Sequence, residues 1–192
     1  ITEDNANYLI KIISRLIFIY FLKERKLIPE DLFSKDKIFP LIDKNEPNET
    51  AYYKAILQNL FFGILNTPIS NGRFKKLRNK NYLRDEAAIE KLFSEIPFVN
   101  GGLFDIADEP YSNSENILTV SDDLFFGKER EIDLSKFFPQ RKKAKVEGII
   151  NILNHYKFTI EENTPIEEEI ALDPELLGKV FENLLAAINP QT

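Results

Sequence analysis

The 192-residue chain contains no cysteine, no methionine, no tryptophan and a single histidine, His155. The absence of cysteine excludes disulfide frameworks, thiolate zinc sites, iron–sulfur clusters and cysteine nucleophiles. One histidine also excludes metal sites that need two imidazoles and leaves little scope for histidine acid–base catalysis. The chain has no P-loop, no dinucleotide-binding fingerprint and no Gly-x-Ser-x-Gly sequence. These absences favour a chain that binds a partner or positions neighbouring domains over a chain that contains a complete active site.

Long apolar runs are missing as well. The most apolar stretch, Leu16 to Leu22, has seven residues, whereas a bilayer span needs about 20. Arg15 and Lys23 flank it without a small-residue cleavage site, so it does not resemble a signal peptide. The chain begins with isoleucine and not with methionine. We therefore expect a piece of a longer cytoplasmic protein that has no contact with a membrane.

The composition is that of a globular domain, with 43% hydrophobic and 29% charged residues and with 16 phenylalanines. A chain of this length buries roughly 70% of its unfolded surface, which permits one hydrophobic core. No internal repeat or flexible linker divides it. The sequence predicts a single domain over 1–192 of the mostly α class, an irregular helical bundle with a few short β-strands.

Hydrophobic spacing and capping residues predict the helices. We expect a central helix over 2–26, a second helix capped by Thr50 and reaching Leu65, and a short helix opened by Asp85 or Glu86. An amphipathic helix is expected over 141–154, with His155 at its C-terminal cap.

Shorter elements are expected between and after these helices. Ser121 and Asp133 are candidate caps of two single helical turns. Short strands are expected at 117–120, 156–160 and 169–172.

The net charge is −6, and its distribution is uneven. The segment 50–84 has seven Lys or Arg and no acid, whereas 155–192 has eight acids and two bases. Nucleic-acid-binding domains are usually basic overall, so the total argues against DNA binding while the local basic segment favours it.

Two basic runs are candidate DNA contacts, because cations neutralise phosphates and aromatic rings can stack on bases. The first run is interleaved with Phe74 and Tyr82. Its cations are Arg73, Lys75, Lys76, Arg78, Lys80 and Arg84. The second run, 141–145, is expected at a helix N-terminus, where cations oppose the helix dipole. Its candidates are Lys142, Lys143 and Lys145. The alternative for both runs is a solvated surface that aids solubility.

Three further features have ordinary structural explanations. The acids at 161–169 lack the Asp-x-Asp spacing and the glycine of a calcium loop, which indicates solvated surface. Asn100-Gly101-Gly102 lacks the Lys-Ser/Thr pair of a phosphate loop, which indicates a tight turn. Glu24-Arg25-Lys26 matches the Glu-x-Lys of restriction nuclease sites but ends an apolar helix instead of following a strand and a metal-binding Asp.

Two strings are fairly specific as a pair. They are Ile96 to Asp105 with its Asn-Gly-Gly-Leu-Phe core, and Asp173-Pro174-Glu175-Leu176-Leu177-Gly178 followed by Phe181-Glu182-Asn183-Leu184-Leu185. Two further strings accompany them, Arg15-Leu16-Ile17-Phe18 with Phe21-Leu22-Lys23 near the start and Phe158 to Pro165 before the last helix. In sequence order the strings span most of the chain. The pattern resembles the helical connector region ahead of the methyltransferase domain in type IIG restriction–modification enzymes and related adenine-specific DNA methyltransferases.

The resemblance implies a helical connector that bridges neighbouring domains and can face DNA. The parent enzyme would transfer a methyl group from S-adenosylmethionine to an adenine extruded from the duplex. The family's Tyr-Thr-Pro element, glycine-rich cofactor loop and Asn-Pro-Pro-Tyr/Phe motif are absent, and Asn189-Pro190-Gln191 is not that motif. No catalytic, cofactor-binding or metal residue therefore carries over, and a methyltransferase domain is expected after residue 192.

A last helix over 173–187 would then dock on that domain in cis. Its docking candidates are Leu177, Gly178, Phe181, Leu184 and Leu185. Two other interpretations stay open: a stand-alone helical protein-interaction module, favoured by the acidic total, and a self-sufficient weak DNA-binding domain, favoured by the basic runs.

Overall fold

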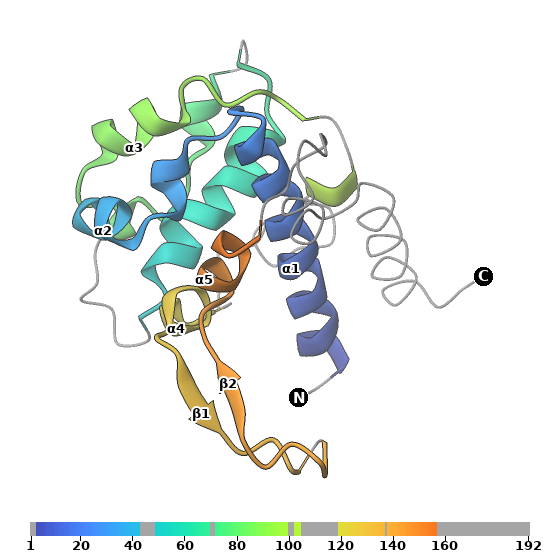
Figure 1. Cartoon of the computed structure of the whole chain (residues 1–192). Helices are drawn as coiled ribbons and strands as arrows, with labels where there is room; N and C mark the ends of the chain where they lie inside the picture. The colour runs from blue at the N-terminus through green and yellow to red at the C-terminus, as the bar shows by residue number, and fades with distance from the viewer. Residues whose placement is uncertain are drawn as a thin grey trace, which may run out of the picture.

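The computed structural model describes residues 3–42, 49–69, 72–99, 102–104, 119–136 and 138–156, and Figure 1 shows their arrangement. Helices surround one hydrophobic core, and a two-stranded sheet projects from it. The mostly α fold class with short strands is confirmed for these residues. The strands expected at 156–160 and 169–172, most of 117–120 and the helix expected over 173–187 lie outside the described residues.

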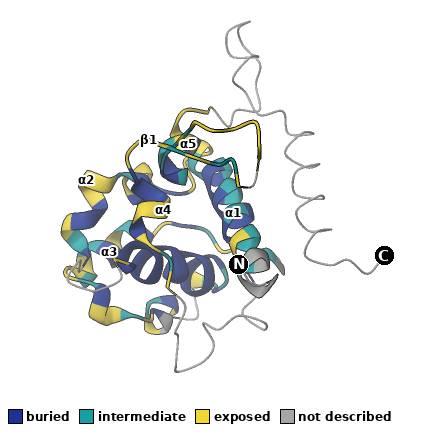
Figure 2. Ribbon diagram, turned by 90° about the horizontal axis from the view of Figure 1, so that it is seen from below, coloured by how far each residue is buried: buried dark blue, intermediate teal, exposed yellow. Residues whose placement is uncertain are grey.

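The centre of the core is a helix over residues 51–65, every residue of which is buried and drawn dark blue in Figure 2. It is π-helical from Tyr53 to Leu57 and from Asn59 to Leu65. A helix buried on all sides must be covered by neighbours, and here the neighbours are the other helices of the bundle. The predicted second helix is therefore confirmed, with the addition of π-helical turns.

The N-terminus of this helix is capped from a distant segment. The Asp122 carboxylate accepts a hydrogen bond of 2.9 Å from the backbone N–H of Tyr52. The expected capping role of the Thr50 hydroxyl is wrong, because that hydroxyl accepts from the N–H of Val120 instead, at 3.1 Å. A carboxylate also suits a helix N-terminus better, since it complements the positive end of the dipole.

α1, Glu3–Glu24, packs on this central helix. Leu16 and Ile19 are fully buried, whereas Ile13 and Ile17 are only partly buried. The predicted helix is confirmed, but the central, fully covered position belongs to residues 51–65.

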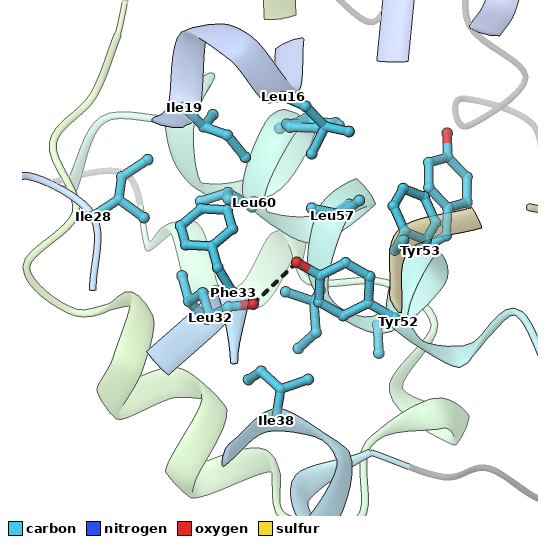
Figure 3. Packing of buried hydrophobic residues seen from close by; sticks show 14 of the residues in the cluster. Leu16, Ile19, Ile28, Leu32, Phe33, Ile38, Tyr52, Tyr53, Leu57 and Leu60 are labelled. Carbon is cyan, nitrogen blue, oxygen red and sulfur yellow. Dashed lines mark hydrogen bonds between the residues drawn. The ribbon is translucent and has the colours of Figure 1, made fainter. Parts of the chain in front are cut away.

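Short turns of helix close the core on another side. They are η1 (Glu30–Phe33), α2 (Lys35–Ile38) and η2 (Phe39–Leu41). Figure 3 shows Leu32, Phe33 and Ile38 packed around Tyr52, whose hydroxyl donates to the Leu32 carbonyl at 3.0 Å. A buried phenol needs such a partner, so this bond fixes the position of η1.

α3, Glu86–Phe93, begins as predicted: the Asp85 carboxylate accepts from the N–H of Ala88 at 3.0 Å. The segment between the central helix and α3 includes the 3₁₀-helical turns η6 (Arg73–Lys76) and η7 (Lys80–Tyr82). A further turn, η8 (Gly102–Phe104), follows α3.

The last described elements are α4 (Asp122–Phe126), β1 (Arg130–Ile132), β2 (Ala144–Val146) and α5 (Ile149–Asn154). Ser121 caps α4 as predicted by accepting from the N–H of Asp123 at 3.2 Å.

One prediction in this part of the chain is wrong: the helix over 141–154 starts only at Ile149, after Gly148, and residues 144–146 form β2 instead. Asp133 caps a single helical turn as predicted, because its carboxylate accepts from the N–H of Ser135 at 2.8 Å and the N–H of Phe138 donates to the Leu134 carbonyl at 2.8 Å. Hydrogen bonds from the hydroxyl and the N–H of Ser135 lower the pKa of Asp133.

Candidate nucleic-acid interface

The first basic run lies in the segment 72–84, called here the basic loop, which is held against the central helix by side-chain amides. Asn59 donates to the carbonyl of Arg78 at 2.9 Å and accepts from its N–H at 2.8 Å. Asn79 has a left-handed backbone (φ 54°) and donates to the Lys54 carbonyl and the Gln58 side chain at 3.1 and 2.9 Å. The loop is thus a fixed part of the fold.

Arg73 belongs to the core and not to the surface, since only 1% of it is exposed. Its guanidinium donates to the carbonyls of Ile96, Ser94 and Phe93 at 2.5, 2.7 and 3.2 Å. These carbonyls follow or end α3, where a cation complements the helix dipole. Burial lowers the pKa of Arg73, but a guanidinium stays charged at neutral pH. We leave Arg73 out of any DNA-contact surface.

The other cations of the basic loop are exposed at Lys75, Arg78, Lys80 and Arg84, while the side chain of Lys76 lies outside the described residues. Lys80 forms an ion pair with Glu86 of α3. The hydrogen bond to Glu86 raises the pKa of Lys80, and the charges of Glu86 and Glu90 act in the same direction. Acidic neighbours therefore offset part of the loop's charge.

The second basic run lies on a β-hairpin, which we call the arm and define as residues 128–146. β1 and β2 pair antiparallel with Glu131 opposite Lys145. Because no helix begins near Arg141, the expected conflict of these cations with a helix dipole does not arise. The arm projects from the body beside α4 and α5 (Figure 1).

Ion pairs join the two sides of the arm. The Lys145 ammonium lies 2.9 Å from the Glu129 carboxylate, and the Lys143 ammonium lies 3.9 Å from that of Glu131. The hydrogen bond to Glu129 raises the pKa of Lys145. Such exposed pairs contribute little to stability, so their main effect is to neutralise two of the predicted contact residues.

Other cations of the arm stand at its tip. Lys136, Arg141 and Lys142 are exposed, and no ion pair to them is found among the described residues. The Arg141 guanidinium lies 6.0 Å from the centre of the Phe138 ring, itself 58% exposed. Arg141 begins the second basic run but was not among its predicted contact residues, and Lys136 lies outside both runs. The turn residue Pro139 between them was the available signal for a hairpin.

Two glycines fix the base of the arm. The N–H of Gly148 donates to the Gly127 carbonyl at 2.8 Å. A Cβ at Gly148 would lie 2.6 Å from the Gly127 nitrogen and would overlap the Phe125 carbonyl. Only glycine permits this close approach of two backbones. The arm is therefore attached at a packed junction and not through a loose linker.

Aromatic residues of α4 anchor this junction in the core. The Phe126 ring lies 4.7 Å from that of Tyr52, and Phe125 is fully buried. From α1, the Tyr20 hydroxyl contacts the Ile150 carbonyl and the Asn154 side chain at 3.3 and 3.0 Å. The arm is thus mounted on the same core as α1 and the central helix.

The two basic runs do not form one surface. The basic loop contacts α3 through Arg73 and Lys80, whereas the arm leaves the body beside α4 and α5. Figure 1 shows α3 and the arm at opposite ends of the molecule. A duplex lying along one region would not at the same time follow the other.

Two of the strings that carry the family resemblance contact each other. Arg15 of α1 is 3% exposed and donates to the Leu103 carbonyl of the Asn-Gly-Gly-Leu-Phe string at 2.8 Å. Its guanidinium lies 4.8 Å from the Phe62 ring centre, and the Phe104 ring lies 5.7 Å from that of Phe18. The strings thus correspond to one packing unit on the central helix.

The remaining predicted sites are outside this description or show no special chemistry. Leu177, Gly178, Phe181, Leu184, Leu185 and the acids at 161–169 lie outside the described residues. His155 caps α5 as predicted, and its imidazole lies 3.5 Å from the Glu147 carboxylate. Within the described ranges, no group of three His, Cys, Asp or Glu could hold a metal ion, and no helix is long and apolar enough to cross a membrane.

Comparison with known proteins supports the resemblance. Over 183 residues the chain is 30% identical to a Methanocaldococcus jannaschii protein named "Putative type II restriction enzyme and methyltransferase". The match covers 95% of this chain but 12% of that protein, so the chain corresponds to about an eighth of its relative. No protein-family model matches the chain, and no solved structure is similar to it. The similarity to this class of restriction and methyltransferase proteins is thereby confirmed.

Proposed function

We propose that this chain is a non-catalytic connector of a type II restriction enzyme or adenine-specific DNA methyltransferase, which faces DNA and positions neighbouring domains. The observation that carries the proposal is the similarity of nearly the whole chain to a short part of a much longer protein of that class. A segment of this size within such a protein has the dimensions of one domain among several.

The packing of the described residues suits a connector. α1 has 22 residues and is therefore roughly 33 Å long, the span of a small domain. It is joined to the string at Leu103 through Arg15 and to α5 through Tyr20. A long helix that is held by buried contacts at two points resists bending. It can therefore keep the domains on either side at a fixed distance and orientation.

In this proposal the chemistry resides elsewhere in the parent enzyme. S-adenosylmethionine would bind to a methyltransferase domain in cis, which would transfer the methyl group to an adenine amino group in DNA. This chain would contribute contacts to phosphates, which set the register on the duplex without reading the sequence.

The test compares the complete product of the gene with the 192-residue chain. We expect the complete product to transfer labelled methyl groups from S-adenosylmethionine to adenine in DNA, and we expect calorimetry to show no binding of S-adenosylmethionine by the chain alone. One-to-one micromolar binding by the chain would contradict the proposal. A gene that ends soon after Thr192 would also contradict it and would favour the protein-interaction module.

A further inference from the structure

We infer that the arm is the element through which this chain contacts duplex DNA, and that Lys136, Arg141 and Lys142 at its tip contact the phosphates. The inference rests on the proposed function, since a DNA-acting parent enzyme makes the duplex the relevant partner. It selects the arm over the basic loop and adds two cations to the predicted contacts: Arg141, which belongs to the second basic run, and Lys136, which lies outside both runs.

The arm is a basic projection on an acidic molecule. Residues 128–146 contain seven Lys or Arg and three Asp or Glu, a net charge of +4. Because the whole chain carries −6, the rest of it carries −10. A polyanion is therefore repelled by the chain as a whole and attracted by this segment, which orients the approach of a duplex toward the arm.

Ion pairing within the arm leaves the positive charge at the tip. Glu129 pairs with Lys145 and Glu131 pairs with Lys143, and these four residues lie in the two strands or directly beside them in the sequence. Beyond the strands, Lys136, Arg141 and Lys142 have no such neighbour among the described residues. The surface that would reach a phosphate first is thus the least neutralised part of the arm.

The shape and mounting of the arm suit this contact. The major groove of DNA is about 12 Å wide and admits a two-stranded ribbon, with phosphates along both edges. An isolated hairpin is only marginally stable, but the Gly127–Gly148 junction and the buried Phe125 hold this one in place. A hairpin that is already held at its base loses less entropy when it binds than an unattached hairpin does.

The basic loop is the weaker candidate. Arg73 is buried, Lys80 pairs with Glu86, and the charge of Glu90 also acts on Lys80. The exposed cations that remain there make it a matched control surface for the arm.

The experiment measures binding of the 192-residue chain to a fluorescent duplex by anisotropy as a function of salt. Two triple variants each remove three positive charges from exposed positions, so the change in total charge is equal. The arm variant carries Lys136→Gln, Arg141→Gln and Lys142→Gln, and the loop variant carries Lys75→Gln, Arg78→Gln and Arg84→Gln. Circular dichroism and urea unfolding check that both variants fold like the wild type.

We expect the arm variant to bind at least tenfold more weakly at about 50 mM salt, with a logarithmic salt slope shallower by about 2.7, that is about 0.9 for each lost phosphate contact. The loop variant should keep the wild-type slope. Loss of binding in the loop variant alone would overturn the inference and leave the proposed function intact.

Two other results would also overturn the inference. Binding of the wild type to poly-L-glutamate as tightly as to the duplex would assign the arm to an acidic protein partner. If no form of the chain binds the duplex at about 50 mM salt, the DNA-facing part of the proposed function fails together with the inference.

Discussion

Replacement of Arg15 by methionine tests whether the strings at α1 and Leu103 form one packing unit. Methionine keeps most of the apolar stem but cannot donate to the Leu103 carbonyl or interact as a cation with the Phe62 ring. A charge-assisted hydrogen bond contributes about 1.5–3 kcal/mol, and a desolvated cation–π contact adds up to about 2 kcal/mol. Methionine avoids the desolvation penalty of a buried guanidinium, which offsets part of the lost interaction energy. We expect Arg15→Met to lower the free energy of unfolding by about 2–4 kcal/mol.

The assay is urea unfolding followed by circular dichroism, with Arg25→Met as the matched control. Arg25 follows the same helix and also lies over an aromatic ring, at 5.5 Å from that of Phe21, but it is exposed. The free energy of unfolding of the control should stay within about 0.5 kcal/mol of the wild-type value, as is usual for substitutions at exposed positions. Equal stability of Arg15→Met and the wild type would refute the assigned role of Arg15.

Three further predictions follow from buried groups. Arg73→Met should cost about 3–5 kcal/mol in urea unfolding, because it leaves three carbonyls near the end of α3 without their donor; a neutral result would place Arg73 at the surface after all. Gly148→Ala should cost about 1–3 kcal/mol by forcing apart the base of the arm, and wild-type stability would refute the close approach there. Burial raises the pKa of Tyr20 and Tyr52 above 10.0, so their contribution to stability is complete below about pH 10 and falls above it by about 1.4 kcal/mol per pH unit for each phenol. The measurement is the free energy of unfolding at pH 9 and at pH 11, for the wild type and for Tyr20→Phe. If the wild type loses no more stability between these pH values than Tyr20→Phe does, the prediction is wrong.

Local patterns predicted most of the helices. The apolar spacing of Tyr53, Ile56 and Leu60 and the cap at Asp85 are signals within a few residues, and the corresponding helices form as expected. The cap from Asp122 could not be predicted from local patterns, because Asp122 lies 70 residues from Tyr52 in the sequence.

The arm shows where a local pattern misleads. Val146, Ile149 and Leu153 have helical spacing, but Gly148 stops the helix between them and the residues before it pair with β1. Gly148 was a signal that could have placed the boundary correctly.

The candidate site was predicted less well than the fold, for a physical reason. Charge is visible in a sequence, whereas burial and pairing are not. Arg73 and Lys75 are similar in the sequence, yet one is in the core and the other at the surface. Lys145 and Lys142 are also similar in the sequence and both exposed, yet among the described residues only Lys145 forms an ion pair with a carboxylate.

The most direct test of the central claim is steady-state methyl transfer by the complete gene product with the substitutions Lys136→Gln, Arg141→Gln and Lys142→Gln in the arm. A non-catalytic segment that faces DNA contributes to binding and not to the chemical step, so KM for DNA should rise about tenfold or more while kcat stays unchanged. An unchanged KM together with a reduced kcat at saturating DNA would contradict the account.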